Sequence, residues 1–287
     1  MNRSKGGDNG VENQSDKFVH KKSLGQNFLT SDVVPRWMCE AAKLEADDVV
    51  LEIGPGTGML TRAILAHGAR VIAIEADQRA VESLNNTFTD YVKEQKLTII
   101  HGDVREVTPN NLGLKDHGFK VIANIPYYLS GYLLRQLLET DIQPINLTFL
   151  IQKELAERIA RDAKESILSL SVKAFGSPVY IKTVTKGHFN PKPRVDSAIL
   201  SIYDINRDSF QALDLKLFFR LVHLGLGNKR KQLLSNLSRE YDRPLLTSIF
   251  SSLSIPGDVR GEDLSIEIWL RLAKELSTSR NVIETEQ

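Results

Sequence analysis

The sequence predicts a doubly wound α/β domain with a largely parallel sheet, followed by a small all-α domain. Two observations favour this fold class. Between residues 49 and 151, short apolar runs alternate with helical patterns, as they do where helices connect parallel strands. Beyond residue 206 the strand pattern stops and only helical spacing remains.

Seven strands are expected. Five are apolar runs, at residues 49–53, 71–75, 97–101, 119–123 and 147–151. We expect helices at 57–66, from the N-cap Asp77 toward Gln95, and at 128–139, 153–161 and 166–175. The last two strands form a pair, at 179–184 and 197–203, separated by the long loop 188–196.

Three segments are expected along the chain. Residues 1–16 are rich in Gly, Asn and Ser with mixed charge, which indicates a disordered tail. Residues 17–205 form the sheet domain. Residues 206–287 form the helical domain, with helical spacing at 213–226, 229–237 and 264–276.

Composition limits the class of protein. The 287 residues include 41% hydrophobic and 25% charged side chains, values typical of a soluble globular protein. A single cysteine, Cys39, cannot form an internal disulfide and is expected in the core. No apolar run is long enough to span a membrane, and no signal peptide is evident, so we expect a cytoplasmic protein. The six histidines lack metal-ligand spacing, so no metal is expected.

A glycine turn follows the first strand. Gly54, Gly56 and Gly58 can bring the backbone close to a ligand, and the next helix offers its N-terminal amides to an anion. A dinucleotide site needs a third glycine at the sixth position of this motif, where Met59 stands. A nicotinamide oxidoreductase is therefore a remote alternative.

Acidic residues follow the next two strands. Glu75 is placed to accept hydrogen bonds from both hydroxyls of a ribose, and Asp103 to accept one from an adenine amino group. Alternatively, Glu75 caps the following helix and Asp103 makes a turn. With the glycine turn, the set fits S-adenosylmethionine better than NAD.

The fourth strand ends in Asn124-Ile125-Pro126-Tyr127. The Asn124 side-chain oxygen and the Ile125 carbonyl can accept both N–H bonds of an adenine amine, which frees its lone pair to attack a methyl group. Tyr127 offers a ring for stacking on the base, commonly worth about 1–3 kcal/mol. In isolation, this motif would be read as a proline turn with a half-buried tyrosine.

Five stretches carry a family resemblance: LGQNFL at 24–29, EIGPGTGMLT at 52–61, NIPYYLS at 124–130, QKELAERIA at 152–160 and FNPKPRVDSA at 189–198. With these, the chain resembles the ribosomal RNA adenine N6,N6-dimethyltransferases. The resemblance implies a Rossmann-like class I methyltransferase sheet and S-adenosylmethionine as cofactor. It also implies dimethylation of two adjacent adenosines in the 3′-terminal hairpin loop of 16S rRNA, during biogenesis of the small subunit.

The resemblance also implies roles for particular residues. The implied cofactor site consists of Gln26, Asn27, Leu29, Gly54, Gly56, Gly58, Glu75, Asp103 and Asn124. The implied catalytic set is Asn124, Ile125, Tyr127 and Phe189, with Phe189 near the target base opposite Tyr127. Two positions depart from the family's usual pattern, Ile125 in place of Leu and Tyr128 in place of Asn.

Basic side chains suggest where RNA binds. Lys153, Arg158 and Arg161 are expected on one helix face, Lys192 and Arg194 in the proline loop, and Arg220, Lys229, Arg230 and Lys231 in the helical domain. Net charge is only +1, so each could instead belong to an ordinary solvated face. The expected partners are small-subunit rRNA and the immature small ribosomal subunit, bound by a monomer.

Two further functions remain as alternatives. Large-subunit 23S rRNA methyltransferases of the macrolide-resistance type share the features at 26–29 and 124–127, but usually lack the GPGTG form and VDSA. A largely non-catalytic role, as a ribosome assembly factor or a transcription accessory protein, is the other alternative.

Overall fold

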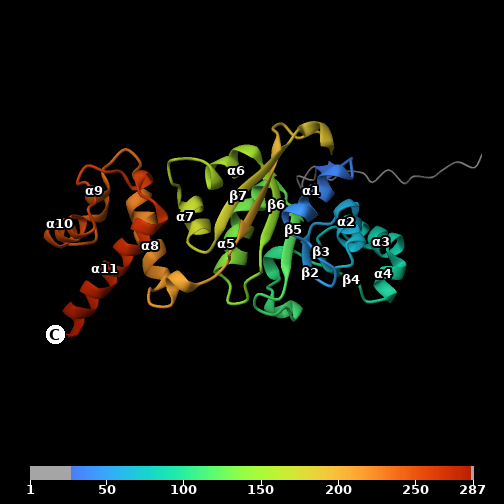
Figure 1. Cartoon of the computed structure of the whole chain (residues 1–287), viewed down its shortest axis with the longest axis horizontal. Coiled ribbons are helices and arrows are strands. Elements are labelled where there is room, and N and C mark those ends of the chain that lie inside the picture. The colour runs from blue at the N-terminus through green and yellow to red at the C-terminus, as the bar shows by residue number, and fades with distance from the viewer. Residues whose placement is uncertain (1–26, 286–287) are drawn as a thin grey trace, which may run out of the picture.

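The computed structural model describes residues 27–285, with side chains described to residue 278. The expected tail at 1–16 and Gln26 lie outside this part. Seven strands form one sheet in the order β4-β3-β2-β5-β6-β9-β7 (Figure 1). They are β2 (Val49–Ile53), β3 (Arg70–Glu75), β4 (Leu97–His101), β5 (Lys120–Asn124), β6 (Leu147–Gln152), β7 (Ser177–Val184) and β9 (Ser197–Tyr203). A separate pair joins β1 (Phe28–Leu29) to β8 (Phe189–Asn190).

The sheet is parallel from β4 to β6 and antiparallel from β6 through β9 to β7. Glu75 is in register with His101, and Asn124 with Leu150. Because parallel strands end at the same edge, the residues after β2, β3, β4 and β5 meet there. The predicted fold class, a doubly wound seven-stranded sheet followed by a helical C-terminal region, is confirmed.

Helices cover both faces of the sheet, and the last four helices form a separate C-terminal region beside it. The described helices are α1 (Val33–Ala41), α2 (Met59–Ala66), α3 (Gln78–Thr87), α4 (Thr89–Lys93), α5 (Ser130–Glu139), α6 (Lys153–Ala160), α7 (Ile167–Lys173), α8 (Leu215–Leu226), α9 (Leu233–Leu237), α10 (Arg243–Ser252) and α11 (Ile266–Thr285). No helix in the described part of the chain combines the length and apolar character that crossing a membrane requires.

Alternating side chains of the strands fill two cores. In β2, Val50 packs with α1 and α2 on one face, whereas Leu51 and Ile53 belong to the core that contains α5. This alternation follows from the two-residue period of a strand. Burial on both faces explains why the strand sequences are continuous apolar runs.

The C-terminal helices α8 to α11 lie at one end of the molecule, beyond α7 (Figure 1). Trp269 of α11 is fully buried among them, and its indole Nε1 donates to the carbonyl of Gly261 at 3.2 Å. Strand β9 ends at Tyr203 and α8 begins at Leu215. We propose that the domain boundary lies between these two elements.

The structure differs from the sequence expectations in three places. The helix expected from Asp77 to Gln95 is broken at the buried Phe88, which packs against the glycine turn. Helix α10 was not expected, although Asp242 caps it through the Leu245 amide at 3.2 Å. Strands β1 and β8 have two residues each, too few for a periodic pattern.

Candidate active site

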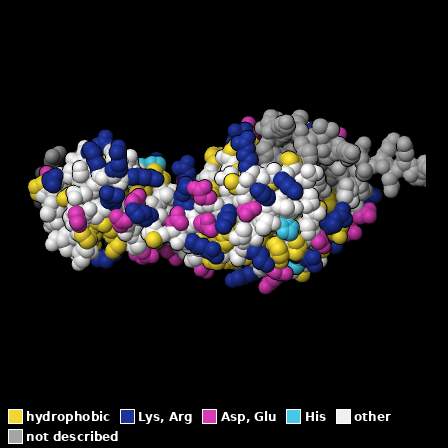
Figure 2. Space-filling view, turned by 90° about the horizontal axis from the view of Figure 1, so that it is seen from above, with side chains coloured by type: hydrophobic (Ala, Val, Ile, Leu, Met, Phe, Trp, Pro, Cys, Tyr) yellow, Lys and Arg dark blue, Asp and Glu magenta, His cyan; other side chains and the backbone are white. Residues whose placement is uncertain are grey.

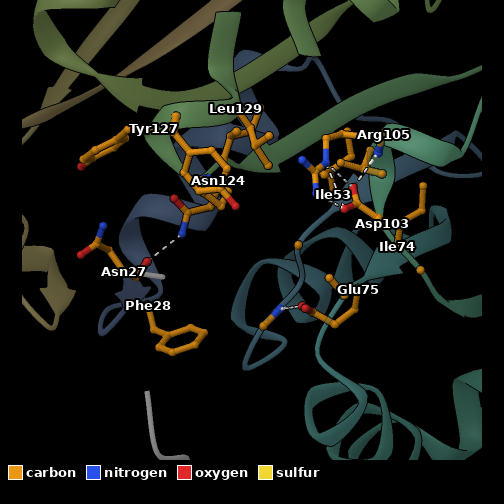
Figure 3. Close-up of a pocket in the computed structure, with 18 residues that line it drawn as sticks. Asn27, Phe28, Ile53, Ile74, Glu75, Asp103, Arg105, Asn124, Tyr127 and Leu129 are labelled. Atoms are coloured by element: carbon orange, nitrogen blue, oxygen red, sulfur yellow. Dashed lines mark hydrogen bonds and ion pairs between the residues drawn. The ribbon is translucent and has the colours of Figure 1, made fainter. Parts of the chain in front are cut away.

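An open pocket of about 930 Å³ lies at the carboxyl ends of the parallel strands. It brings together eight of the predicted site residues: Asn27, Gly54, Gly56, Glu75, Asp103, Asn124, Ile125 and Tyr127. Asn124 and Tyr127 lie on one side of it, and Glu75 and Asp103 on the other (Figure 3). Such a position is typical of a small-molecule site in an open α/β sheet.

Glu75 holds the glycine turn. Its Oε2 accepts a hydrogen bond from the Gly56 amide at 3.0 Å, and its Oε1 accepts one from the Asp77 amide at 2.9 Å (Figure 3). Glu75 is 3% exposed. Each carboxylate oxygen can accept a second hydrogen bond, so Glu75 can brace the turn and still bind two hydroxyl groups.

The glycines of the turn serve different purposes. Gly54, Gly56 and Gly58 all have positive φ, which favours glycine. A Cβ at Gly54 would meet no atom closer than 4.0 Å, so the open space there belongs to the pocket. At Gly58 a Cβ would lie 2.6 Å from the Phe88 ring, so this glycine permits close packing behind the pocket. Gly58 is not in the pocket lining.

Asp103 is paired with Arg105. Arg105 Nε donates to both carboxylate oxygens at 3.0 Å, and the Arg105 amide donates to Oδ1 at 2.9 Å. Hydrogen bonds from Arg105 hold the pKa of the Asp103 carboxyl below its usual value. Asp103 therefore caps a short turn, as the alternative interpretation expected, while remaining an ionised acceptor at the pocket wall.

The Asn124 amide has a defined orientation. Its Nδ2 donates to the Asn27 carbonyl at 3.1 Å, so Oδ1 is the atom turned away from Asn27 (Figure 3). A side-chain amide held in this way keeps its oxygen free to accept a hydrogen bond from a group in the pocket. Ile125 follows directly, which places a backbone carbonyl next to this acceptor.

Tyr127 is anchored by a residue that the sequence analysis did not single out. Its hydroxyl lies 2.8 Å from Oγ of Ser197, a fully buried residue of β9. Burial raises the pKa of the Tyr127 phenol, and the hydrogen bond with Ser197 partly opposes this. Ser197 lies in the VDSA part of a recognised motif, but its contact with Tyr127 spans 70 residues and had no local signal.

Leu29 and Phe189 lie beside the pocket and not in its lining. They face each other in the β1–β8 pair and are 7% and 3% exposed, within the core formed by α1 and α2. The neighbouring Phe28 does line the pocket. Phe189 is buried and absent from the pocket lining, so its contact with a base opposite Tyr127 stays a prediction.

Glu52 is a fully buried carboxyl on β2, two residues before Gly54. Its Oε2 accepts a hydrogen bond from the Thr61 hydroxyl at 2.7 Å, and Oε1 has no partner among the described residues. Burial raises the pKa of Glu52 to about 8. The Thr61 hydrogen bond lowers this pKa, and the charge of Glu75 raises it.

Among the described residues, no group of three His, Cys, Asp or Glu side chains is arranged to hold a metal ion.

The basic residues of α6 do not form one free cationic face. Arg158 pairs with Glu154 at 2.8 Å, and Lys153 with Glu157 at 3.7 Å. Arg161 follows the helix and places its guanidinium 3.7 Å from the centre of the Tyr180 ring. Helical spacing puts an acid one turn from each base, so this face is mixed in charge, and its contact with RNA stays a prediction.

Other basic residues are exposed without ion pairs. Lys192 and Arg194 project from the loop before β9, and Lys229, Arg230 and Lys231 from the turn between α8 and α9. None of these five forms an ion pair with a described residue, whereas Arg220 pairs with Glu240 at 2.7 Å. Lys and Arg side chains are visible on both lobes of the molecule in Figure 2.

The turn between α8 and α9 has a buried brace. Asn236 is fully buried, and its Nδ2 donates to the carbonyls of Gly225 at 2.7 Å and Asn228 at 3.2 Å. The Lys231 amide also donates to the Asn228 carbonyl, at 2.9 Å. These bonds fix the backbone from which the turn's basic side chains project.

The sequence of residues 17–278 matches the model of the family described as ribosomal RNA adenine dimethylase. The chain belongs to this family. It is 35% identical over 258 residues to "Ribosomal RNA small subunit methyltransferase A" of Dehalococcoides mccartyi (strain CBDB1), covering 89% of this chain and 88% of that one. The protein of the same name from Clostridium acetobutylicum is 34% identical over 265 residues, covering 90% and 94%.

Solved structures agree on the fold of this family member. A dimethyladenosine transferase from Plasmodium falciparum matches with a TM-score of 0.76 at 24% identity, covering 88% of this chain and 98% of that one. The 23S rRNA methyltransferase ErmE matches with a TM-score of 0.71 at 24% identity, covering 88% and 100%. The fold is therefore shared with a dimethyladenosine transferase and with a 23S rRNA methyltransferase.

Proposed function

We propose that this chain is an S-adenosylmethionine-dependent methyltransferase that adds two methyl groups to N6 of adenosines in small-subunit ribosomal RNA. Membership of the ribosomal RNA adenine dimethylase family supports the reaction. The observation that carries the proposal is the Asn124 amide, fixed by Asn27 so that an acceptor is presented to the pocket. An exocyclic amine needs such an acceptor on each N–H bond.

The pocket fits the cofactor. Gly54 leaves open space beside the backbone, Glu75 keeps acceptor capacity for a ribose, and Asp103 offers a carboxylate at the far wall. When bound, the cofactor supplies a methyl group on a positively charged sulfur. The carboxylate of Glu75 is held by two backbone amides, so it needs no rearrangement to accept the ribose hydroxyls.

On the target side, Asn124 and Ile125 hold the two N6 hydrogens of the adenine. This withdraws the nitrogen lone pair from the ring and directs it to the methyl group. Tyr127 stacks on the base, and its hydroxyl is fixed to Ser197. The first transfer replaces one N–H bond by an N–CH3 bond, and the proton that the nitrogen loses passes to water. Only one N–H remains, so the base must be held mainly by this stacking while the second methyl group is added.

The small subunit is the favoured substrate because relatives about one-third identical over most of their length bear that name. The likeness to the 23S enzyme is at 24% identity and supports only the fold. We also propose that the chain acts as a cytoplasmic monomer on the immature small subunit. The exposed basic residues of the proline loop and of the α8–α9 turn supply candidate phosphate contacts.

A competition assay tests the substrate. Labelled S-adenosylmethionine and purified protein are incubated with equal amounts of unmodified small and large ribosomal subunits, and the label in each rRNA is counted. We expect label in small-subunit rRNA alone. Label confined to 23S rRNA would favour the large-subunit alternative. Cofactor binding with no transfer to either would favour the assembly-factor alternative.

A further inference from the structure

Two exposed tyrosines stand next to the pocket. Tyr128 belongs to the 3₁₀ turn η4 (Tyr127–Leu129) and is 64% exposed, although it also lines the pocket. Tyr132 lies one helical turn later, in α5, and is 41% exposed. Tyr128 and Tyr132 are among the few large apolar side chains that the described chain leaves in solvent.

A guanidinium group accompanies these rings. The Tyr132 hydroxyl donates to the Arg105 carbonyl at 3.4 Å. The Arg105 guanidinium is held by Asp103 through Nε and Nη2, which leaves Nη1 without a partner among the described residues. The Arg105 side chain is 58% exposed. The hydrogen bonds to Asp103 raise the pKa of Arg105. Arg105 and Tyr128 both line the pocket.

We propose that Tyr128, Tyr132 and Arg105 form a binding subsite for the unpaired nucleotide next to the target adenosine. This inference rests on the proposed function. An adenosine that enters the pocket must leave its stack, so its neighbour loses a stacking partner. Exposed aromatic rings beside a cation bind single-stranded RNA through base stacking and a phosphate contact.

The position of the subsite favours the nucleotide next to the target adenosine as its occupant. Tyr127 and Tyr128 line the same pocket, so a base stacked on Tyr128 would be held at the pocket that receives the target base. The cofactor is the competing occupant for the Tyr128 ring. However, the proposed cofactor contact Glu75 is 3% exposed, whereas Tyr128 is 64% exposed at the mouth of the same pocket.

Steady-state kinetics on unmodified small ribosomal subunits test the subsite. Tyr128→Ala should raise the KM for the subunit roughly tenfold or more, the loss expected for one stacked base. Both kcat at saturating subunit and the Kd for S-adenosylmethionine should stay within about twofold of wild type. Tyr128→Phe, which keeps the ring, should behave like wild type. Tyr91→Ala removes a tyrosine that is 37% exposed on α4, a helix with no residue in the pocket lining, and serves as the matched control.

The kinetic results distinguish a nucleotide subsite from a cofactor contact, and both from a failure of the proposed function. An unchanged KM in Tyr128→Ala, with active wild-type protein, would overturn the subsite and leave the proposed function standing. A tenfold weaker Kd for S-adenosylmethionine with unchanged subunit KM would also overturn it, because the ring would then belong to the cofactor site. Wild-type protein that methylates no subunit would refute the proposed function, and the subsite with it.

Discussion

The hydroxyl of Tyr127 lies 2.8 Å from Oγ of Ser197, which ties the ring proposed to stack on the target base to the antiparallel strand β9. Tyr127 follows β5, and Ser197 is paired with Gln152 at the end of β6. The ring is therefore supported by a strand that contributes no residue to the pocket lining. We expect this bond to matter most in the second transfer, when stacking is the main contact with the base.

Ser197→Ala should lower the rate of dimethylation about two- to tenfold, because a hydrogen bond of about 0.5–1.5 kcal/mol is lost. Tyr127→Phe should have a similar effect, and the double variant should be no worse than either single one. Single-turnover rates of both transfers measure this. The control is Ser201→Ala, which removes an equally buried hydroxyl from the same strand, bonded to Thr148 at 2.9 Å. Fully additive effects of Ser197→Ala and Tyr127→Phe would show that the bond does not position the ring.

Glu75→Ala should weaken S-adenosylmethionine binding by about 1.5–3 kcal/mol, since hydrogen bonds to a charged acceptor are lost and Gly56 loses its brace. Isothermal calorimetry gives the affinity. Glu82→Ala, an exposed carboxylate of α3, serves as the control. If Glu75→Ala bound the cofactor as tightly as wild type, Glu75 would be a brace of the turn and nothing more.

The raised pKa of Glu52 predicts that the free energy of unfolding depends on pH. Its pKa is raised from 4.5 to about 8 on folding, so the folded state holds this proton more tightly than the unfolded state. The contribution of Glu52 to the free energy of unfolding is therefore fully present below pH 4.5. This contribution is lost as pH rises toward 8, by at most about 1.4 kcal/mol per pH unit. Glu52→Gln cannot ionise, and its free energy of unfolding should fall less over this range.

Urea unfolding of wild type and Glu52→Gln at pH 5, 6.5 and 8 checks this expectation. Glu94→Gln, which changes a carboxylate with a side chain 57% exposed, is the control. Parallel stability curves for wild type and Glu52→Gln would mean that Glu52 is ionised in the folded protein.

Replacing Arg230 and Lys231 by Ala should reduce affinity for the small subunit and flatten its salt dependence, by up to about one unit of log–log slope per lost phosphate contact. The control is replacement of Lys93 and Lys96 by Ala, which removes the same charge from α4 and the segment after it, at the opposite end of the molecule. Filter binding at several salt concentrations gives both slopes. Equal slopes for the two double variants would place the RNA elsewhere.

Most of the sheet could be predicted because its strands are buried on both faces and read as apolar runs. The β2 run 49–53 and the β4 run 97–101 have the bounds expected from the sequence. The break at Phe88 could not be predicted, because it results from packing against Gly58, a residue 30 positions away. Local propensity contains no information about such a contact.

The pocket was predictable where its residues follow strands, because parallel strands end at one edge. Glu75, Asp103 and Asn124 meet there. Their hydrogen-bond partners were not predictable. The Asn27 carbonyl that orients Asn124 is 97 residues away in sequence, and Ser197 is 70 residues from Tyr127. The ion pairs of the basic residues in α6 follow from helical spacing, because an acid lies four residues from Lys153 and from Arg158.

The central claim is that the pocket transfers two methyl groups to one adenine nitrogen, with Asn124 as an acceptor. Mass spectrometry of nucleosides from small-subunit rRNA, treated with protein and saturating S-adenosylmethionine, tests it most directly. Wild-type protein should yield mainly N6,N6-dimethyladenosine, and folded Asn124→Ala should be slower by about 10²–10³ in rate. A monomethyl product that never advances, or near-normal turnover by Asn124→Ala, would contradict this account.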